Sequence, residues 1–447
     1  MQKQFKYEFL IPIIVILLRF FPYPFGIFSY LIIAIYALLG PSQAIKALLL
    51  ACFLSQLNFF VFPDVVTYAS GPSSEGQYLV MFTVLSYCAF KIFFQRAFIL
   101  NGPIITTLSL GLFYIVHSIL FSQIVDISLL KVALWTLVMT SLIYLWSLLS
   151  FDEHNILSNE IFLWIGIVVF LSSPLIFMSQ GIARNNNDFQ GLFNGSQVLG
   201  IVCAVLLAFH LGNIFSKKYP SFKVLLFVIF VSYIIFISGS RTAIVALYFS
   251  VITYFISVTF LIKNPLEYHL RIMNNFLFYF FGMMLFVLVT FFSLGDQVIS
   301  KRTNSNSLIE AYLDSRSGLI APMIENIKQD PIIGIGFGIG SDYENMSSTR
   351  DPLFDLPYRA SAEKGLIFIA VFEEVGIIGL TLFLLWLLFI FKIAIHNRAN
   401  QILVLFAIVF LNFGESMIFS SGGIGLLCMI LLAWIMTSKP YKSHHNE

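Results

Sequence analysis

The chain has 447 residues, of which 59% are hydrophobic and only 11% are charged, and its formal net charge is +2. Soluble domains carry roughly 25% charged residues, so this composition excludes a water-soluble globular protein. The small net charge also argues against binding to nucleic acid. The surface is therefore expected to face lipid.

Apolar runs long enough to cross a bilayer recur along almost the whole sequence, because a transmembrane helix needs roughly 20 residues. They predict spans near 9–22, 24–39, 43–62, 78–95, 104–122, 127–149, 160–178, 196–215, 223–238, 242–262, 273–294, 364–391, 401–416 and 418–437. Short turns separate the first two and the last two runs, so we expect about 12 to 14 spans. A β-barrel would show short alternating segments instead. The predicted fold class is an all-α integral membrane protein, a polytopic helical bundle forming a single multi-spanning domain over residues 1–447.

Basic residues indicate the orientation of this bundle, since they concentrate on the cytoplasmic side of a membrane. With a cytoplasmic N-terminus, the inner segments hold Lys3, Lys6, Lys46, Lys91, Arg96, Lys217, Lys218, Lys223, Lys263, Arg271, Lys392, Arg398, Lys439 and Lys442. Both termini are then predicted to be cytoplasmic. The acidic pair Asp152 and Glu153 is the exception on that side.

Polar residues with possible chemistry fall on the predicted outer connections. Arg184 follows the span at 160–178, and Arg241 stands between two apolar runs in IFISGSRTAIVALYF. An arginine at the end of a span is often an interface anchor, but it can also face a water-filled cavity. Planar guanidinium groups can hold phosphate oxygens through two donors, so these arginines are candidate anion ligands.

The longest outer connection covers residues 295–363 and contains Arg316. Connections of this length are usually functional or disordered. Its apolar residues from Leu308 to Ile327 recur at helical spacing, so we expect a folded loop. Pro322 is expected to start or kink a helix there, and Pro331 to end it.

The run from Gly334 to Gly340, GIGFGIG, does not match the spacing of nucleotide-binding motifs, and we reject that interpretation. Gly334 and Gly336 instead predict close packing of backbone against helices or a lipid chain. Asp342 and Glu344 could bind a cation, but a single acidic pair is more often solvated. We therefore predict no metal and no cofactor. The four cysteines lie in apolar runs without metal or disulfide spacing.

Charged residues surround the start of the next span, in RASAEKGLIFIAVFEEVGIIGL. Glu363 is a candidate general base if it reaches an attacking hydroxyl. Glu373 and Glu374 lie inside an apolar helix, so they need partners or water, and we expect them to bond to the folded loop or to nearby arginines.

Three blocks of this sequence resemble the O-antigen ligase and O-antigen polymerase superfamily of bacterial polysaccharide assembly. They are SGSRTAIVAL, SRSGLIAPMIENIKQDPIIGIGFG and FEEVGIIGL, with GLFNGSQVLG as a fainter fourth match. Together they cover roughly residues 180–385. The N-terminal spans match only as hydrophobic helices.

The resemblance implies an inverting, metal-independent glycosyltransferase of the bacterial cytoplasmic membrane. A hydroxyl of an acceptor sugar would attack a glycan carried on undecaprenyl pyrophosphate at the outer face. Its partners would be that lipid-linked glycan, membrane lipids and other assembly proteins, such as a flippase or a chain-length regulator.

The resemblance also assigns roles to single residues. Arg241 and Arg316 are expected to act in catalysis and to hold the pyrophosphate, while Arg184, Arg359 and Lys364 would contribute to substrate binding. Supporting roles are expected for Pro331, Gly334, Gly336, Glu374, Gly376 and Gly379.

Ligases of this family carry a His-Asn pair about nine residues before the helix glutamate, where this chain reads Glu363-Lys364-Gly365-Leu366. That departure favours a polymerase, with Glu363 as a substitute base, over a ligase that transfers glycan to lipid or protein. A transporter or flippase of lipid-linked sugars is the alternative from another class. Transporters place polar sites near the bilayer midplane between repeated halves, whereas these candidates crowd one face.

Overall fold

A computed structural model describes residues 10–19, 23–57, 73–182, 188–216, 221–261, 308–346, 348–350, 357–360 and 364–438. Within these ranges the chain forms fourteen α-helices, two short 3-10 helices and one two-stranded ribbon. The predicted span at 273–294 and residues 295–307 lie outside the described residues.

The first half of the bundle contains α1 (Leu10–Arg19), α2 (Tyr23–Ala37), α3 (Pro41–Ser55), α5 (Ser73–Phe93), α6 (Gly102–Phe121), α7 (Val125–Ser147) and α8 (Phe151–Ser172). The 3-10 helices η3 (Ser173–Phe177) and η4 (Ser179–Gly181) follow. The second half contains α9 (Ser196–Phe215), α10 (Phe222–Ile237), α11 (Arg241–Leu261), α13 (Leu308–Gln329), β1 (Ser348–Arg350), β2 (Pro357–Ala360), α14 (Ile367–Ile395), α15 (Ala399–Leu411) and α16 (Gly423–Thr437).

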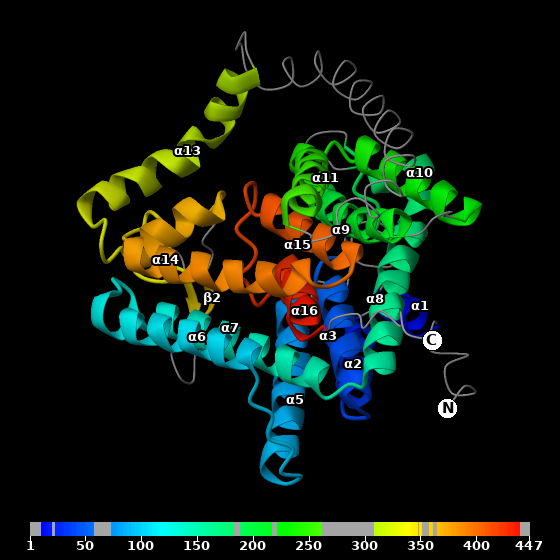
Figure 1. Ribbon diagram of the computed structural model, residues 1–447, viewed down its shortest axis with the longest axis horizontal. Coiled ribbons are helices and arrows are strands. Elements are labelled where there is room, and N and C mark those ends of the chain that lie inside the picture. Colours follow the sequence, from blue (N-terminus) through cyan, green and yellow to red (C-terminus); the bar gives the residue numbers. More distant parts are fainter. Residues whose placement is uncertain are drawn as a thin grey trace.

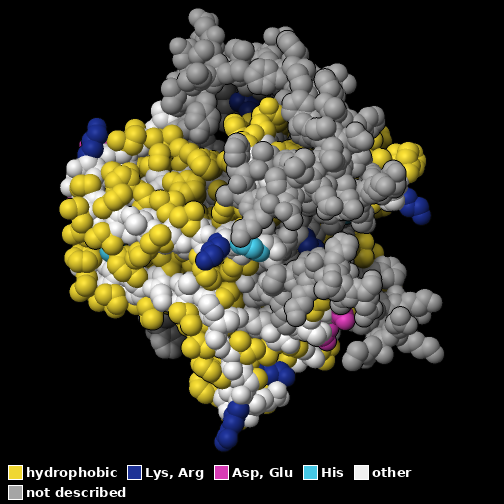
Figure 2. All heavy atoms as spheres, in the orientation of Figure 1, with side chains coloured by type: hydrophobic (Ala, Val, Ile, Leu, Met, Phe, Trp, Pro, Cys, Tyr) yellow, Lys and Arg dark blue, Asp and Glu magenta, His cyan; other side chains and the backbone are white. Residues whose placement is uncertain are grey.

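Each predicted span within the described residues coincides with a helix, so the all-α, multi-pass fold is confirmed. Seven of the described helices are long and apolar enough to cross a membrane by themselves. The other apolar helices have 10 to 17 residues. Figure 2 shows apolar side chains spread over the face formed by α6 and α14, as a surface in contact with lipid requires.

Helix α8 explains the acidic exception on the predicted inner side. Ser150 and Glu153 form a capping box, in which the Ser150 hydroxyl accepts from the Glu153 N–H and the Glu153 carboxylate accepts from the Ser150 N–H. Asp152 lies in the same first turn. Carboxylates are favourable there because they satisfy free backbone donors and oppose the positive end of the helix dipole.

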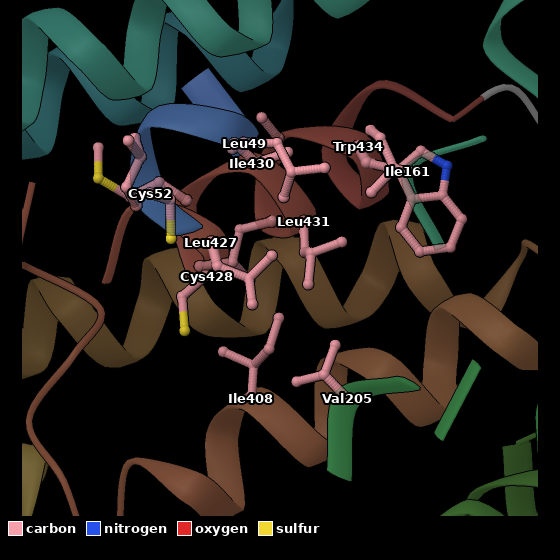
Figure 3. Packing of buried hydrophobic residues seen from close by; sticks show 14 of the residues in the cluster. Leu49, Cys52, Ile161, Val205, Ile408, Leu427, Cys428, Ile430, Leu431 and Trp434 are labelled. Carbon is pink, nitrogen blue, oxygen red and sulfur yellow. The ribbon is translucent and has the colours of Figure 1, made fainter. Parts of the chain in front are cut away.

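The core of the bundle surrounds α16, which lies between α3, α7 and α15 (Figure 1). Figure 3 shows Leu427 and Leu431 of α16 packed near Ile408 of α15 and Val205 of α9. Apolar side chains cover this helix on every side, and all four cysteines are free and buried.

Bonds and ring contacts join the described connections into groups at two ends of the bundle. At one end, His154 of α8 contacts Thr437 of α16 (Nε2 to Oγ1, 3.2 Å), and the Arg398 guanidinium lies over the Phe151 ring. At the other end, the Gln123 N–H donates to Ile335 O (3.0 Å). We call this second end the loop face; it comprises connections 122–124, 188–195, 238–240, 331–346, 364–366 and 412–422.

Candidate functional site

The loop after α13 is built against a break in α14. Helix α13 contains Pro322 and ends at Gln329, before Pro331. Helix α14 loses helical geometry at Val375 and Gly376, where Gly376 has φ +63°.

Backbone bonds to the loop replace those that α14 loses at this break. The carbonyls of Glu373 and Glu374 accept from the N–H groups of Ile335 (2.9 Å) and Gly336 (2.8 Å), and the Ile377 N–H donates to Pro331 O (3.0 Å). Because buried backbone groups need partners, the loop and the break stabilise each other.

Glycines make this close approach possible. A side chain on Gly376 would collide with the backbone of Ile332, and one on Gly334 would collide with the backbone of Glu373. Both glycines also have positive φ, which side chains disfavour. The expected close packing of Gly334 against a helix is therefore present in the structure.

Three charged side chains behind the break form a cluster that we call the carboxylate clasp: Lys364, Glu373 and Glu374. The Lys364 Nζ lies 2.7 Å from Glu373 Oε2 and 3.1 Å from Glu374 Oε1. Glu373 is fully buried, and Lys364 is 3% exposed. Burying ions without partners would be costly, so this pairing is what allows the charges inside the protein.

The clasp also holds the loop. Glu373 accepts from Asn326 Nδ2 of α13 (2.7 Å) and from the Ser341 hydroxyl (3.2 Å). Glu374 accepts from the Gly338 N–H (2.7 Å). The glutamates therefore bond to the folded loop, one of the two partners expected from the sequence.

Helices α6 and α7 hold the loop from its other side, through residues for which the sequence predicted no role. The His117 Nε2 lies 2.6 Å from Ile333 O, and Lys131 Nζ donates to Gly338 O (2.6 Å). Tyr114 donates its hydroxyl to Gly379 O in α14 (3.1 Å). Of these residues, Lys131 gave a signal in the sequence, because a lysine inside an apolar run needs a partner for its charge.

Arg241 is the first residue of α11 and lies exposed on the loop face. Within the described part of the chain its guanidinium has no ion-pair or hydrogen-bond partner. Its Ser-Gly-Ser turn includes Gly239 at φ +62°, packed against the Asp188 carboxylate. A free cationic side chain beside a helix N-terminus is well placed to bind an anion.

One connection links Arg241 to the clasp. Gly414, after α15, packs against Thr242, the neighbour of Arg241. Two residues further, the Ser416 N–H donates to Lys364 O (3.2 Å). The start of α11 and the start of α14 therefore flank the same short connection on the loop face.

Other candidate residues are described only in part. Arg316 lies within α13, and Arg359 lies on β2 opposite Thr349, but only their backbones are described. Glu363 directly precedes Lys364 and, like Arg184, lies outside the described residues. The ribbon itself is held to α7 by an ion pair between Arg350 Nη2 and Asp126 Oδ2 (2.7 Å).

One acidic residue of the loop, Asp342, bonds to its own turn. Asp342 accepts from the backbone and side-chain nitrogens of Asn345. Across the described ranges, no group of three or more His, Cys, Asp or Glu side chains is placed to hold a metal ion.

The helices and the polar loop face define a multi-pass, all-α membrane protein with a folded loop bonded to a broken helix. Residues 225–384, from α10 into α14, match the family model described as O-antigen ligase. They contain Arg241, α13, the loop and the clasp, and the match supports membership of the O-antigen ligase and polymerase family. No curated protein matches the chain. The family consists of glycosyltransferase-like enzymes that act on lipid-linked glycans.

Proposed function

We propose that this protein polymerises polysaccharide repeat units at the outer face of the bacterial cytoplasmic membrane. It would transfer a glycan from undecaprenyl pyrophosphate to a hydroxyl of an acceptor repeat unit that is itself lipid-linked. The observation that carries this proposal is Arg241, an exposed guanidinium on the loop face that has no partner among the described residues and lies within the segment that matches the family.

The proposed reaction needs a contact for the leaving group and an acceptor for one proton. The acceptor hydroxyl oxygen attacks the anomeric carbon from the side opposite the pyrophosphate, so the anomeric configuration inverts. The bond between that carbon and the phosphate oxygen breaks, and the lipid pyrophosphate leaves with the bonding electrons. Glu363 takes the hydroxyl proton.

The arginines would stabilise the negative charge that develops on the leaving group. Charge-assisted bonds from Arg241 and Arg316 to phosphate oxygens strengthen as the bond breaks, so they stabilise the transition state more than the ground state. The energy for the new linkage comes from the sugar–pyrophosphate bond, which is why the proposal requires no nucleotide site or metal.

A chain-length assay distinguishes this proposal from its alternatives. Purified protein in detergent receives lipid-pyrophosphate-linked repeat units, and the products are separated by size. A ladder of products at repeat-unit intervals is expected. Transfer only to a foreign lipid or protein acceptor would identify a ligase instead, and movement of the substrate across vesicles without any new linkage would identify a transporter.

A further inference from the structure

Three helices on one side of the bundle enclose a cavity that the proposed reaction does not use. Helix α9 packs against both α8 and α10 (Figure 1), and the cavity is lined by residues of all three helices. Its volume is about 500 Å³, which falls within the range of small-molecule sites, roughly 300–1,000 Å³. The cavity is therefore large enough to hold a ligand.

The wall of this cavity is mostly hydrocarbon. Leu163 of α8 and Phe227 of α10 line it on two sides. Toward the loop face the outer helices close on each other, because a Cβ atom on Gly166 would lie 3.3 Å from Phe227 Cζ, and the Phe170 and Phe230 rings lie 6.2 Å apart. Leu163 is 55% exposed, so the cavity opens sideways onto a surface that lipid covers.

Polar side chains line the cavity at the end away from the loop face. They are Asn159 of α8, Asn213 of α9 and Ser221, which directly precedes α10. The Asn213 Oδ1 accepts from Asn400 Nδ2 of α15 (3.0 Å), so the Asn213 amide nitrogen remains available as a donor. Because α9 ends and α10 begins beside these side chains, they lie at the depth where lipid headgroups are expected.

One histidine lies deeper in the same cavity. The His210 ring packs against the rings of Phe209 and Phe227, at centroid distances of 5.5 and 5.0 Å. Among the described residues its ring nitrogens have no hydrogen-bond partner, which is costly in apolar surroundings. His210 stands five residues before the end of α9, or about 7.5 Å along the helix. A ligand with a polar atom just below its headgroup would satisfy this ring.

The charges around the polar end favour an anion. Lys223 is exposed in the first turn of α10, between the lining residues Ser221 and Val224. No carboxylate is among the residues that line the cavity. Glu160, the neighbour of Asn159 in the sequence, is already paired with Lys46 (2.6 Å). A negatively charged headgroup therefore meets a cation and amide donors here, without a facing negative charge.

We propose that this cavity binds an anionic glycerophospholipid. One acyl chain fills the apolar space between α8 and α10, an ester carbonyl oxygen accepts from a His210 ring N–H, and the phosphate is bound by the Asn213 amide and Lys223. The ester group distinguishes this ligand from a polyprenyl phosphate, which has no acceptor below its phosphate. The inference is independent of the proposed function, because it uses neither Arg241 nor the carboxylate clasp.

The first test fills the cavity. Native mass spectrometry of the full chain in detergent measures the binding of added phosphatidylglycerol, and of phosphatidylcholine, which has the same esters but no net charge. Wild type is expected to bind phosphatidylglycerol more tightly. Leu163→Trp should weaken that binding at least about 10-fold. Leu226→Trp is the matched control, because Leu226 of α10 is 51% exposed and does not line the cavity; it should bind as wild type does.

Two further variants test the polar contacts. His210→Phe keeps a ring of similar shape and removes the nitrogens, so it should weaken both lipids roughly 3- to 10-fold. Lys223→Gln should weaken phosphatidylglycerol about 5-fold and leave phosphatidylcholine unchanged. Lys392→Gln removes an exposed charge at the end of α14 and serves as the control, with no effect on either lipid.

A phosphatidylglycerol with a photoreactive acyl chain locates the site in the unmodified protein. Its crosslinks are expected in peptides from α8, α9 and α10. Crosslinks only elsewhere, or binding by Leu163→Trp equal to wild type, would overturn the proposal. Equal binding of the two lipids would overturn the choice of an anionic one, and preferential displacement by undecaprenyl phosphate would assign the cavity to a lipid carrier. If a cavity variant does not fold, the crosslinks and Lys223→Gln decide.

Discussion

At the residue scale, one arginine and one glutamate of the family blocks have opposite surroundings. Arg241 is exposed and has no protein partner within the described residues, whereas Glu373 is buried and bonds to three separate segments. Exposure without a partner suits a residue that binds ligand. Burial with every acceptor occupied suits a residue that holds the protein around it.

Arg241→Ala is expected to lower kcat/KM for a lipid-pyrophosphate glycan at least about 100-fold, because charge-assisted bonds to phosphate are worth about 1.5–3 kcal/mol each. Arg241→Lys keeps the charge but loses the bidentate hydrogen bonding of the guanidinium group, so it should recover only part of the rate. Initial rates of glycan transfer measure this effect.

Arg96→Gln provides the control, since Arg96 is exposed on a connection predicted to be at the opposite end of the bundle. It should leave the rate within about 2-fold of wild type. Equal losses in Arg241→Ala and Arg96→Gln would show that the effect is not local to the loop face, and the assignment of Arg241 would be wrong.

At the element scale, α14 acts as the support of the loop. Its break exposes two carbonyls to the loop backbone, and the residues before the break supply the carboxylates of the clasp. The glycine pattern and the acidic pair in FEEVGIIGL therefore serve one structural purpose. They allow an apolar helix to interrupt its own backbone hydrogen bonds and to bond to another segment at the break.

Gly376→Ala tests this account of the break. A side chain there meets the Ile332 backbone and takes a positive φ, so we expect a loss of at least about 2 kcal/mol of stability. The midpoint of thermal unfolding in detergent should fall by several degrees.

Gly318→Ala on α13 is the matched control, since a Cβ atom at this position would meet nothing within 4 Å. Alanine is a better helix former than glycine by roughly 1 kcal/mol, so this variant should be neutral or slightly more stable. A Gly376→Ala protein as stable as Gly318→Ala would contradict the proposed close packing.

At the scale of the whole molecule, bonds join the described connections into two groups at different ends of the bundle. The predicted topology requires this arrangement, because all connections expected on one side of the membrane must lie at the same end of the bundle. Bonds between connections 122–124 and 331–346, and between 364–366 and 412–422, agree with it.

The orientation in the membrane is a further prediction. Asn345→Cys on the loop face is expected to react with a membrane-impermeant thiol reagent in intact cells, whereas Gln95→Cys at the other end should react only after lysis. Both positions are exposed, and the native thiols are buried. The reverse pattern would place the loop in the cytosol and exclude the proposed outer-face reaction.

The sequence alone determined the membrane class, the helices and the relation of this chain to a family, because each depends on local information. A run of apolar residues predicts a helix in lipid whatever surrounds it, and the blocks around Arg241, Arg316 and Glu374 lie in continuous stretches. Even the acidic exception at Asp152 and Glu153 followed a local rule, the capping of α8.

Only the tertiary structure decided which partners the buried charges have. Lys364 was expected to bind substrate, and the structure pairs it with Glu373 and Glu374. His117 and Lys131 come from distant helices to bond the glycine loop. The physical reason is that the stability of a buried charge depends on atoms within a few ångströms, and the folding of the chain, not its order, brings those atoms together.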